Sequence, residues 1–295
     1  MATKIRLDVD GEALCIKGYF GAPAGQVRLG GREARFYAEL ASTLPIDVPP
    51  LRHAGIDEAT GHGVVVMEDL VAAGATFLTA RSPYTPDQVS ATLDQLAALH
   101  AATWDAPRLQ ALPWVASQIE TYVDVIDDAE LGELLAGPRG EGIPDEVRDA
   151  RRVKRGLLAL ARRHAGHPAC VDHCDAHAGN LYEWPDGRVG IIDWATYQLV
   201  HWSFDVAYHI GAVLEPDVRA ATERDLLAHY LDRRAGRGVA SPSFEEAWED
   251  YRCALAYGYF MWAITRRVEE DVMLTFNRRL GTAVAEHRSY ELLDV

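Results

Sequence analysis

The helical periodicity of this sequence stops between residues 171 and 194, where a polar loop and a short apolar run replace it. Residues 173–180 read HCDAHAGN, and the apolar pair Ile191-Ile192 ends at Asp193. A Pro-Asp-Gly sequence at residues 185–187 predicts a short hairpin between them. This segment, which separates two helical parts of the chain, is the candidate for chemistry.

The first seventy residues favour strands. Alternating or Val-rich apolar runs predict four of them, at residues 4–9, 12–20, 51–56 and 62–67. Asp10-Gly11 is a hairpin turn signal between the first two. A helix is predicted over residues 32–44, where Phe36, Leu40 and Leu44 recur at four-residue spacing.

Beyond residue 70 the patterns are mainly helical. Helices are predicted at residues 85–100 and 144–165, and an aromatic-rich helix is predicted from Ser241 onward. We therefore expect an α+β fold with a strand-rich N-terminal lobe over residues 1–70 and a hinge at residues 67–71. A larger helical lobe is expected over residues 71–295, with a catalytic loop at residues 171–194.

Bulk properties exclude some partners. The net charge of −15 leaves no basic footprint for nucleic acid. The longest apolar stretch, residues 253–264, is too short to span a bilayer, so we expect no membrane partner. With no export signal visible and only four cysteines, a cytoplasmic protein without a disulfide framework is expected. Oligomeric state is left open.

The spacing of Asp175, Asn180 and Asp193 suits phosphoryl transfer. One carboxylate must orient the acceptor hydroxyl and take its proton, a role that we assign to Asp175. Asp193 and Asn180 would supply hard oxygen ligands to Mg²⁺. The chain has only two asparagines, so one at this spacing is informative. Alternatively, Asp175 and Asn180 stabilise a polar loop through Asx turns, and Asp193 merely ends a strand.

Lys17 is one of three lysines among 29 basic residues, and it follows an apolar strand sequence, ALCI. There its charge could meet the phosphates of ATP, with Glu33 as the ion-pair partner that holds it. The alternative is a lysine at a strand edge and an ordinary surface glutamate.

With these motifs the chain resembles the aminoglycoside-phosphotransferase and choline-kinase-like superfamily over nearly its whole length, most closely the ecdysteroid-kinase-like branch. The resemblance implies a bilobal protein-kinase-like fold with ATP between the lobes. It also implies that adenine bonds to the backbone near Glu68 and Leu70, and that His173 and Asp205 brace the catalytic loop. For Asp205 the alternative is an acid at a helix N-terminus.

One feature departs from this family. The resemblance implies a further strand and a glycine-rich phosphate cover ahead of the strand at residues 4–9. Only three residues precede that strand, so we expect the first strand and the glycine-rich loop to be lacking. Residues 25–32 lack the Gly-Lys-Ser/Thr ending of a P-loop and cannot replace the cover. Weak ATP binding is expected.

These observations predict an ATP-dependent and Mg²⁺-dependent kinase that transfers the γ-phosphate to a hydroxylated small molecule. The acceptor stays open. One alternative is a catalytically impaired, kinase-like nucleotide-binding or scaffold protein. Another is a zinc site in the loop, built from the sulfur and nitrogen ligands of four closely spaced residues, Cys170, His173, Cys174 and His177.

Overall fold

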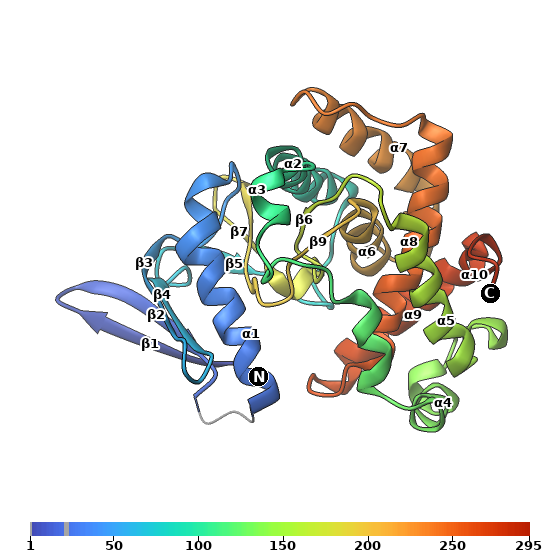
Figure 1. Cartoon of the computed structure of the whole chain (residues 1–295), viewed down its shortest axis with the longest axis horizontal. Helices are drawn as coiled ribbons and strands as arrows, with labels where there is room; N and C mark the ends of the chain where they lie inside the picture. Colours follow the sequence, from blue (N-terminus) through green and yellow to red (C-terminus); the bar gives the residue numbers. More distant parts are fainter. Residues whose placement is uncertain (1, 21–23) are drawn as a thin grey trace. The chain divides into compact units, whose positions relative to one another are not determined.

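A computed structural model describes the backbone of residues 2–20 and 24–295, and the side chains of residues 2–20 and 29–295 (Figure 1). The chain forms two compact units. The first comprises the residues up to 78 together with 180–197, and the second comprises residues 79–179 together with 198–295. The lobe boundary expected at residue 70 stays a prediction. The two compact units differ from the expected lobes, because residues 180–197 belong to the unit that contains the N-terminal residues.

An antiparallel sheet forms the centre of the first unit. Its strands run in the order β1-β2-β4-β3. Their bounds are β1 Thr3–Val9, β2 Glu12–Gly18, β3 Leu51–Asp57 and β4 His62–Glu68. Asp10 and Gly11 join β1 to β2 with φ values of 55° and 86°, so the predicted turn is present with both residues in the left-handed region.

The helix that packs on this sheet starts earlier than the sequence predicted. Helix α1 spans Ala24–Arg35 and continues through the π-helix η1, Phe36–Leu40, into the 3₁₀ turn η2, Ala41–Thr43. The predicted start at residue 32 was wrong because Gly30 and Gly31 have low helix propensity. The close packing of this segment leaves no room for larger side chains: a Cβ on Gly31 would lie 2.7 Å from the carbonyl oxygen of Gly61, and a Cβ on Gly30 would lie 2.8 Å from the Tyr19 ring.

Residues 180–197 belong to the first unit through a second small sheet. Its strands, in the order β5-β7-β8, are β5 Thr76–Phe77, β7 Leu181–Glu183 and β8 Val189–Ile191. The hairpin between β7 and β8 confirms the predicted turn at residues 185–187. Asp47 fixes the sheet, since its carboxylate accepts from the Tyr182 hydroxyl at 2.5 Å and its carbonyl from the Ile191 N–H at 3.0 Å.

The second unit is mainly helical (Figure 1). Its α-helices are α2 Pro86–Thr103, α3 Pro107–Gln110, α4 Asp128–Ala136, α5 Ala150–His164, α6 Ser203–Val213, α7 Pro216–Ala235, α8 Phe244–Ile264, α9 Glu270–His287 and α10 Ser289–Leu292. A two-stranded ladder joins β6, Cys170–Asp172, to β9, Gln198–Val200. The predicted cap of α2 is present, because Thr85 and Gln88 form a reciprocal capping box. Helix α5 begins at Ala150 rather than near 144, with Asp149 as its N-cap.

Helices α6 and α8 form the core of this unit, and every residue of α6 is buried. The aromatic stretch of α8 serves this core, since Tyr251, Tyr257 and Trp262 are 0%, 0% and 3% exposed. These side chains therefore pack the interior of the second unit. Within the described residues, no helix combines the length and hydropathy needed to cross a bilayer.

Buried histidines make the second unit sensitive to acid. Burial lowers the pKa of His209 to about 4 and that of His164 to about 3, from an ordinary value of 6.5. Below pH 6.5 the unfolded chain binds protons at these two histidines that the folded chain does not, so their contribution to the free energy of unfolding should fall on acidification. We expect a slope of up to about 1.4 kcal/mol per pH unit for each histidine between pH 6.5 and about 4.

Reversible denaturant unfolding at a series of pH values measures this slope. His209→Gln, which keeps a donor for the Ala176 carbonyl 2.8 Å from the ring nitrogen, should flatten it. His53→Ala at an exposed position on β3 should leave it unchanged. Constant stability from pH 6.5 to 5 would contradict the prediction.

Candidate active site

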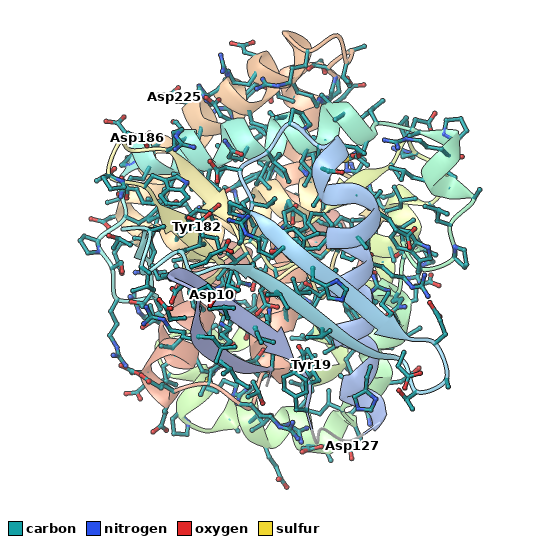
Figure 2. All side chains as sticks on the ribbon, turned by 90° about the vertical axis from the view of Figure 1, so that its left-hand side faces the viewer. Asp10, Tyr19, Asp127, Tyr182, Asp186 and Asp225 are labelled. Atoms are coloured by element: carbon teal, nitrogen blue, oxygen red, sulfur yellow. The ribbon has the colours of Figure 1, made fainter. Side chains whose placement is uncertain are left out.

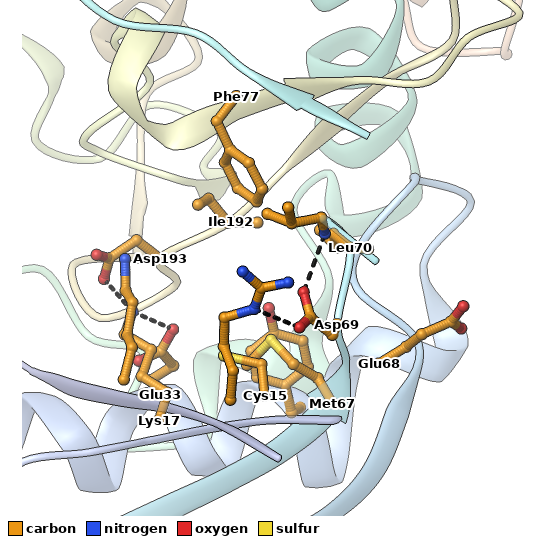
Figure 3. A pocket seen from close by; sticks show the side chains of 14 residues that line it. Cys15, Lys17, Glu33, Met67, Glu68, Asp69, Leu70, Phe77, Ile192 and Asp193 are labelled. Carbon is orange, nitrogen blue, oxygen red and sulfur yellow. Dashed lines mark hydrogen bonds and ion pairs between the residues drawn. The ribbon is translucent and has the colours of Figure 1, made fainter. Parts of the chain in front are cut away.

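Lys17 on β2 lies at the centre of a buried ion-pair cluster (Figure 3). Its Nζ atom is 2.8 Å from Oε1 of Glu33 on α1 and 2.8 Å from Oδ1 of Asp193, which follows β8. The side chains of Lys17 and Glu33 are 5% and 2% exposed, whereas that of Asp193 is 33% exposed. The structure thus brings together three residues that the sequence singled out from separate segments.

Electrostatics keep this lysine charged. Burial by itself would lower the pKa of Lys17, but the carboxylates of Glu33 and Asp193 outweigh it and raise that pKa above its ordinary value. Burial raises the pKa of Glu33, and Lys17 opposes that rise. With both carboxylates ionised, the cluster has one positive and two negative charges, and Asp193 presents oxygen to a hard cation such as Mg²⁺.

Asn180 lies beside Asp193 along the same hairpin. It ends the single turn η6, Ala178–Asn180, and its carbonyl accepts from the Ile192 N–H at 2.9 Å. Asp193 adopts φ 64°, a left-handed conformation that is unfavourable for a residue with a Cβ. Such strain is retained where the surrounding structure fixes it, and it often marks a functional position.

A cavity of about 250 Å³ opens onto this cluster from the sheet. Glu68 and Leu70, the predicted adenine-binding positions, line it together with Lys17, Glu33 and Asp193 (Figure 3). The Glu68 N–H donates to the Pro50 carbonyl at 3.0 Å, so it is already used within the unit.

The sequence did not single out Arg6 and Asp69, which form an ion pair at this cavity. Although burial opposes it, the Arg6 guanidinium and backbone N–H groups lower the pKa of Asp69. The two residues are 63 positions apart, so no local spacing could have indicated that they pair.

Asp175 lies in the second unit, where its loop is tightly held. The Tyr208 hydroxyl on α6 donates to Oδ1 of Asp175 at 2.9 Å, and His177 Nε2 lies 3.6 Å from the same oxygen. The Asp175 N–H donates to Nδ1 of His173 at 3.2 Å, so the two residues are bonded to each other within the loop. Asp175 stays 29% exposed.

Asp205 lies in the first turn of α6 and holds the same loop. Its fully buried carboxylate accepts the N–H groups of His173 at 2.6 Å and Cys174 at 2.7 Å. Cys174 has φ 63°, so these bonds stabilise an unfavourable backbone conformation. The sequence suggested that Asp205 either braces the loop or is an acid at a helix N-terminus. In the structure this acid lies at a helix N-terminus and also contacts the loop.

Two further groups near the loop were not foreseen. The Tyr257 hydroxyl donates to the Cys174 carbonyl at 2.7 Å. Burial and the charge of Asp205 raise the pKa of Asp172 well above its ordinary value, and Asp172 accepts the Asp205 N–H at 3.1 Å. Tyr257 is more than eighty residues from Cys174 in sequence, and only packing brings them together.

The zinc alternative in the loop is not supported. Cys170, His173, Cys174 and His177 do not place their ligand atoms within reach of one ion in the part of the chain that the structure describes. Instead Cys170 donates from sulfur to Asp172, and Nδ1 of His177 accepts the Gly179 N–H at 3.0 Å. The close spacing of these residues raised the zinc site as an alternative, but strand β6 and the loop direct their side chains to different partners.

Comparisons with known proteins identify a family and several similar folds. The sequence model of a family described as the phosphotransferase enzyme family matches residues 8–242. No curated protein matches the sequence. Choline kinase LicA from Streptococcus pneumoniae has a similar structure, with a TM-score of 0.57 and 18% identity over 96% of this chain and 89% of that one.

Two further solved structures are similar. The ethanolamine kinase of Plasmodium vivax has a TM-score of 0.61 and 12% identity, over 98% of this chain and 81% of that one. An aminoglycoside-3'-phosphotransferase of type VIII has a TM-score of 0.53 and 22% identity, over 87% and 89%. These matches establish an α+β kinase-like fold with an N-terminal antiparallel sheet and a helical C-terminal part.

Proposed function

Because this chain belongs to the phosphotransferase enzyme family, we propose that it transfers the γ-phosphate of ATP to a hydroxyl group of a small molecule. The observation that carries the proposal is the buried cluster of Lys17 with Glu33 and Asp193, both at 2.8 Å, beside a cavity in the same unit. In protein kinases a lysine paired with a glutamate contacts the phosphates of ATP, and the buried pairing of Lys17 with Glu33 supports the same role here. Choline kinase LicA is known in complex with AMP, and an aminoglycoside 2'-phosphotransferase in complex with GDP.

The residues of the first unit fit ATP and Mg²⁺. Lys17 would bind the phosphates, and Glu33 would hold its ammonium in place. Asp193 and Asn180 would hold Mg²⁺ through oxygen atoms, and the net negative charge of the cluster supports a cation there. Bound Mg²⁺ would neutralise charge on the phosphates during transfer. Adenine would bond to the backbone near Glu68 and Leu70.

Asp175 would act as the base that orients the acceptor hydroxyl and takes its proton. The Tyr208 hydroxyl bond at 2.9 Å fixes the orientation of its carboxylate. Asp205 and His173 would act as positioning residues, since they bind the backbone of the loop rather than the substrate. We place Asp175 in this role also because only four residues separate it from Asn180 in the chain.

The acceptor class is a hydroxylated small molecule. The structurally similar proteins are named as kinases of choline, ethanolamine and aminoglycosides. The closer resemblance to the ecdysteroid-kinase-like branch stays a prediction. We also propose that the chain has a bilobal arrangement with ATP between the lobes. A cytoplasmic location is a further proposal.

A panel of hydroxylated compounds tests the function. The chain would be incubated with ATP, Mg²⁺ and choline, ethanolamine, aminoglycosides or lipid and steroid alcohols, and phosphorylated product would be detected by mass spectrometry. We expect at least one compound to gain a phosphoryl group while ATP is consumed. Nucleotide binding without transfer to any alcohol would instead favour the catalytically impaired, scaffold alternative.

Lys17→Ala is expected to lower the rate of transfer by about 10²–10³, because it removes a preorganised charge from the phosphates. Lys17→Arg should rescue poorly, since a planar guanidinium fits badly between Glu33 and Asp193. Steady-state kinetics with the identified acceptor measure both. Lys154→Ala is the matched control, because this lysine binds the Ile126 carbonyl at 2.8 Å in the second unit. Full activity of the arginine variant would exclude the proposed role.

A further inference from the structure

Three histidines that are not among the proposed catalytic residues meet in the second unit. His164 is the last residue of α5, His167 follows in the next turn, and His201 lies directly after β9. One ligand nitrogen from each lies within 4.8 Å of the others. The phosphoryl transfer proposed above does not involve these three histidines.

The fold fixes this meeting. Gly166, with φ 80°, turns the chain after α5, and the His167 N–H donates to the His164 carbonyl at 3.1 Å. Cys170 on β6 pairs with Val200 on β9 in an antiparallel ladder. Residues just before Cys170 and just after Val200 therefore lie at the same end of that ladder. His167 and His201 occupy those positions.

His164 provides a second observation that points to a ligand. It is 8% exposed, and neither ring nitrogen has a hydrogen-bond partner. Such buried nitrogens are normally paired, because an unmade hydrogen bond costs about 1–3 kcal/mol. Its ring stacks on that of His201 with centroids 3.9 Å apart.

The surroundings admit a cation. His164, His167 and His201 line a cavity of about 380 Å³, and His167 and His201 also line a second one of about 540 Å³. Asp250 Oδ2 lies 3.9 Å from His201 Nε2. Two guanidinium groups oppose a cation here: that of Arg163 is engaged by Asp250 at 3.1 Å and Glu249 at 2.8 Å, and the charge of Arg234 also acts on His201.

We propose that His164, His167 and His201 form a binding site for Zn²⁺ or a similar divalent transition metal, with water or Asp250 in the remaining position. Three imidazoles with an open fourth position suit zinc. Tetrahedral zinc with Zn–N distances of about 2.1 Å holds its nitrogens roughly 3.4 Å apart. Side-chain rotations must therefore bring the nitrogens closer by up to about 1.4 Å and turn one of the stacked rings. His167 is exposed and can move.

The proposed metal site lies close in sequence to an acid that holds the loop carrying Asp175. His201 is four residues before Asp205, the acid that accepts two N–H groups of the loop carrying Asp175. The Nδ1 atom of His201 lies 2.8 Å from the hydroxyl oxygen of Ser203, at the start of α6, and the two are hydrogen-bonded. A metal at the three histidines would join the end of α5, the β6–β9 ladder and the start of α6, and so stabilise the support of that loop.

Metal binding to the full chain tests the proposal without any activity measurement. The purified protein would be stripped with a chelator and titrated with Zn²⁺ against a chromophoric competitor, with zinc content measured by elemental analysis. We expect a single zinc ion per chain and a rise in Tm with zinc. His167→Ala at an exposed position should lower zinc affinity by at least about 100-fold and abolish the rise in Tm.

Two controls separate the site from incidental binding. His167→Cys keeps a zinc ligand and should restore the affinity that His167→Ala loses. His53→Ala removes an exposed histidine of the first unit and should change nothing. Equal zinc affinity in His167→Ala and the wild type, or loss of zinc in Asp193→Asn instead, would overturn the proposal.

Discussion

Asp193→Asn is expected to reduce phosphoryl transfer by about 10³-fold or more. A catalytic metal ion contributes several kcal/mol to stabilising the transition state, and each 1.4 kcal/mol corresponds to about a factor of ten in rate. Replacing the carboxylate of Asp193 by an amide also leaves Glu33 as the remaining carboxylate that pairs with Lys17 in this cluster. The variant should bind nucleotide more weakly in the presence of Mg²⁺, whereas affinity measured without Mg²⁺ should change less.

Steady-state kinetics and calorimetry with and without Mg²⁺ make this measurement. Asp186→Asn is the matched control: it changes an exposed acid of the same hairpin that bonds Arg188 at 2.9 Å (Figure 2). It should retain wild-type rates. A Mg²⁺-dependent affinity that is unchanged in Asp193→Asn would remove this residue from the proposed metal site.

Asp175→Asn is expected to lower the rate by about 10²–10⁴, the usual contribution of a general base. The amide oxygen can still accept the Tyr208 hydroxyl bond of 2.9 Å, so the loop should keep its structure. Nucleotide affinity should therefore stay near the wild-type value with or without Mg²⁺. The two aspartate variants are thus distinguished by binding, although both lose turnover.

A rate measurement under saturating acceptor and nucleotide, combined with calorimetry, checks this second expectation. Asp225→Asn on α7, an exposed acid of the same unit, serves as the control (Figure 2). If Asp175→Asn and Asp193→Asn both keep wild-type turnover, the assignment of the catalytic residues is wrong.

Much of the secondary structure was predictable because its signals are local. The Asp10-Gly11 turn, the hairpin at residues 185–187 and the cap of α2 depend on residues adjacent in sequence. The start of α1 could not be predicted, because Gly30 and Gly31 weaken the helix signal. Their presence is explained by close contacts with Tyr19 and Gly61, which are distant in sequence. The sequence also did not indicate that residues 180–197 belong with the N-terminal part. Asp47 and Tyr182 are hydrogen-bonded although they are 135 positions apart.

The sequence by itself determined which residues are candidates for chemistry. Asp175, Asn180 and Asp193 are recognisable from their spacing, and Lys17 from its rarity and its apolar strand. Only the tertiary structure decided which side chains support them: Tyr208 and Asp205 contact a loop more than thirty residues away, and the aromatic residues of α8 fill the core. The three histidines, at positions 164, 167 and 201, likewise meet only through the β6–β9 register. Spacing along a chain encodes local geometry, whereas burial and pairing across distant segments depend on how those segments pack.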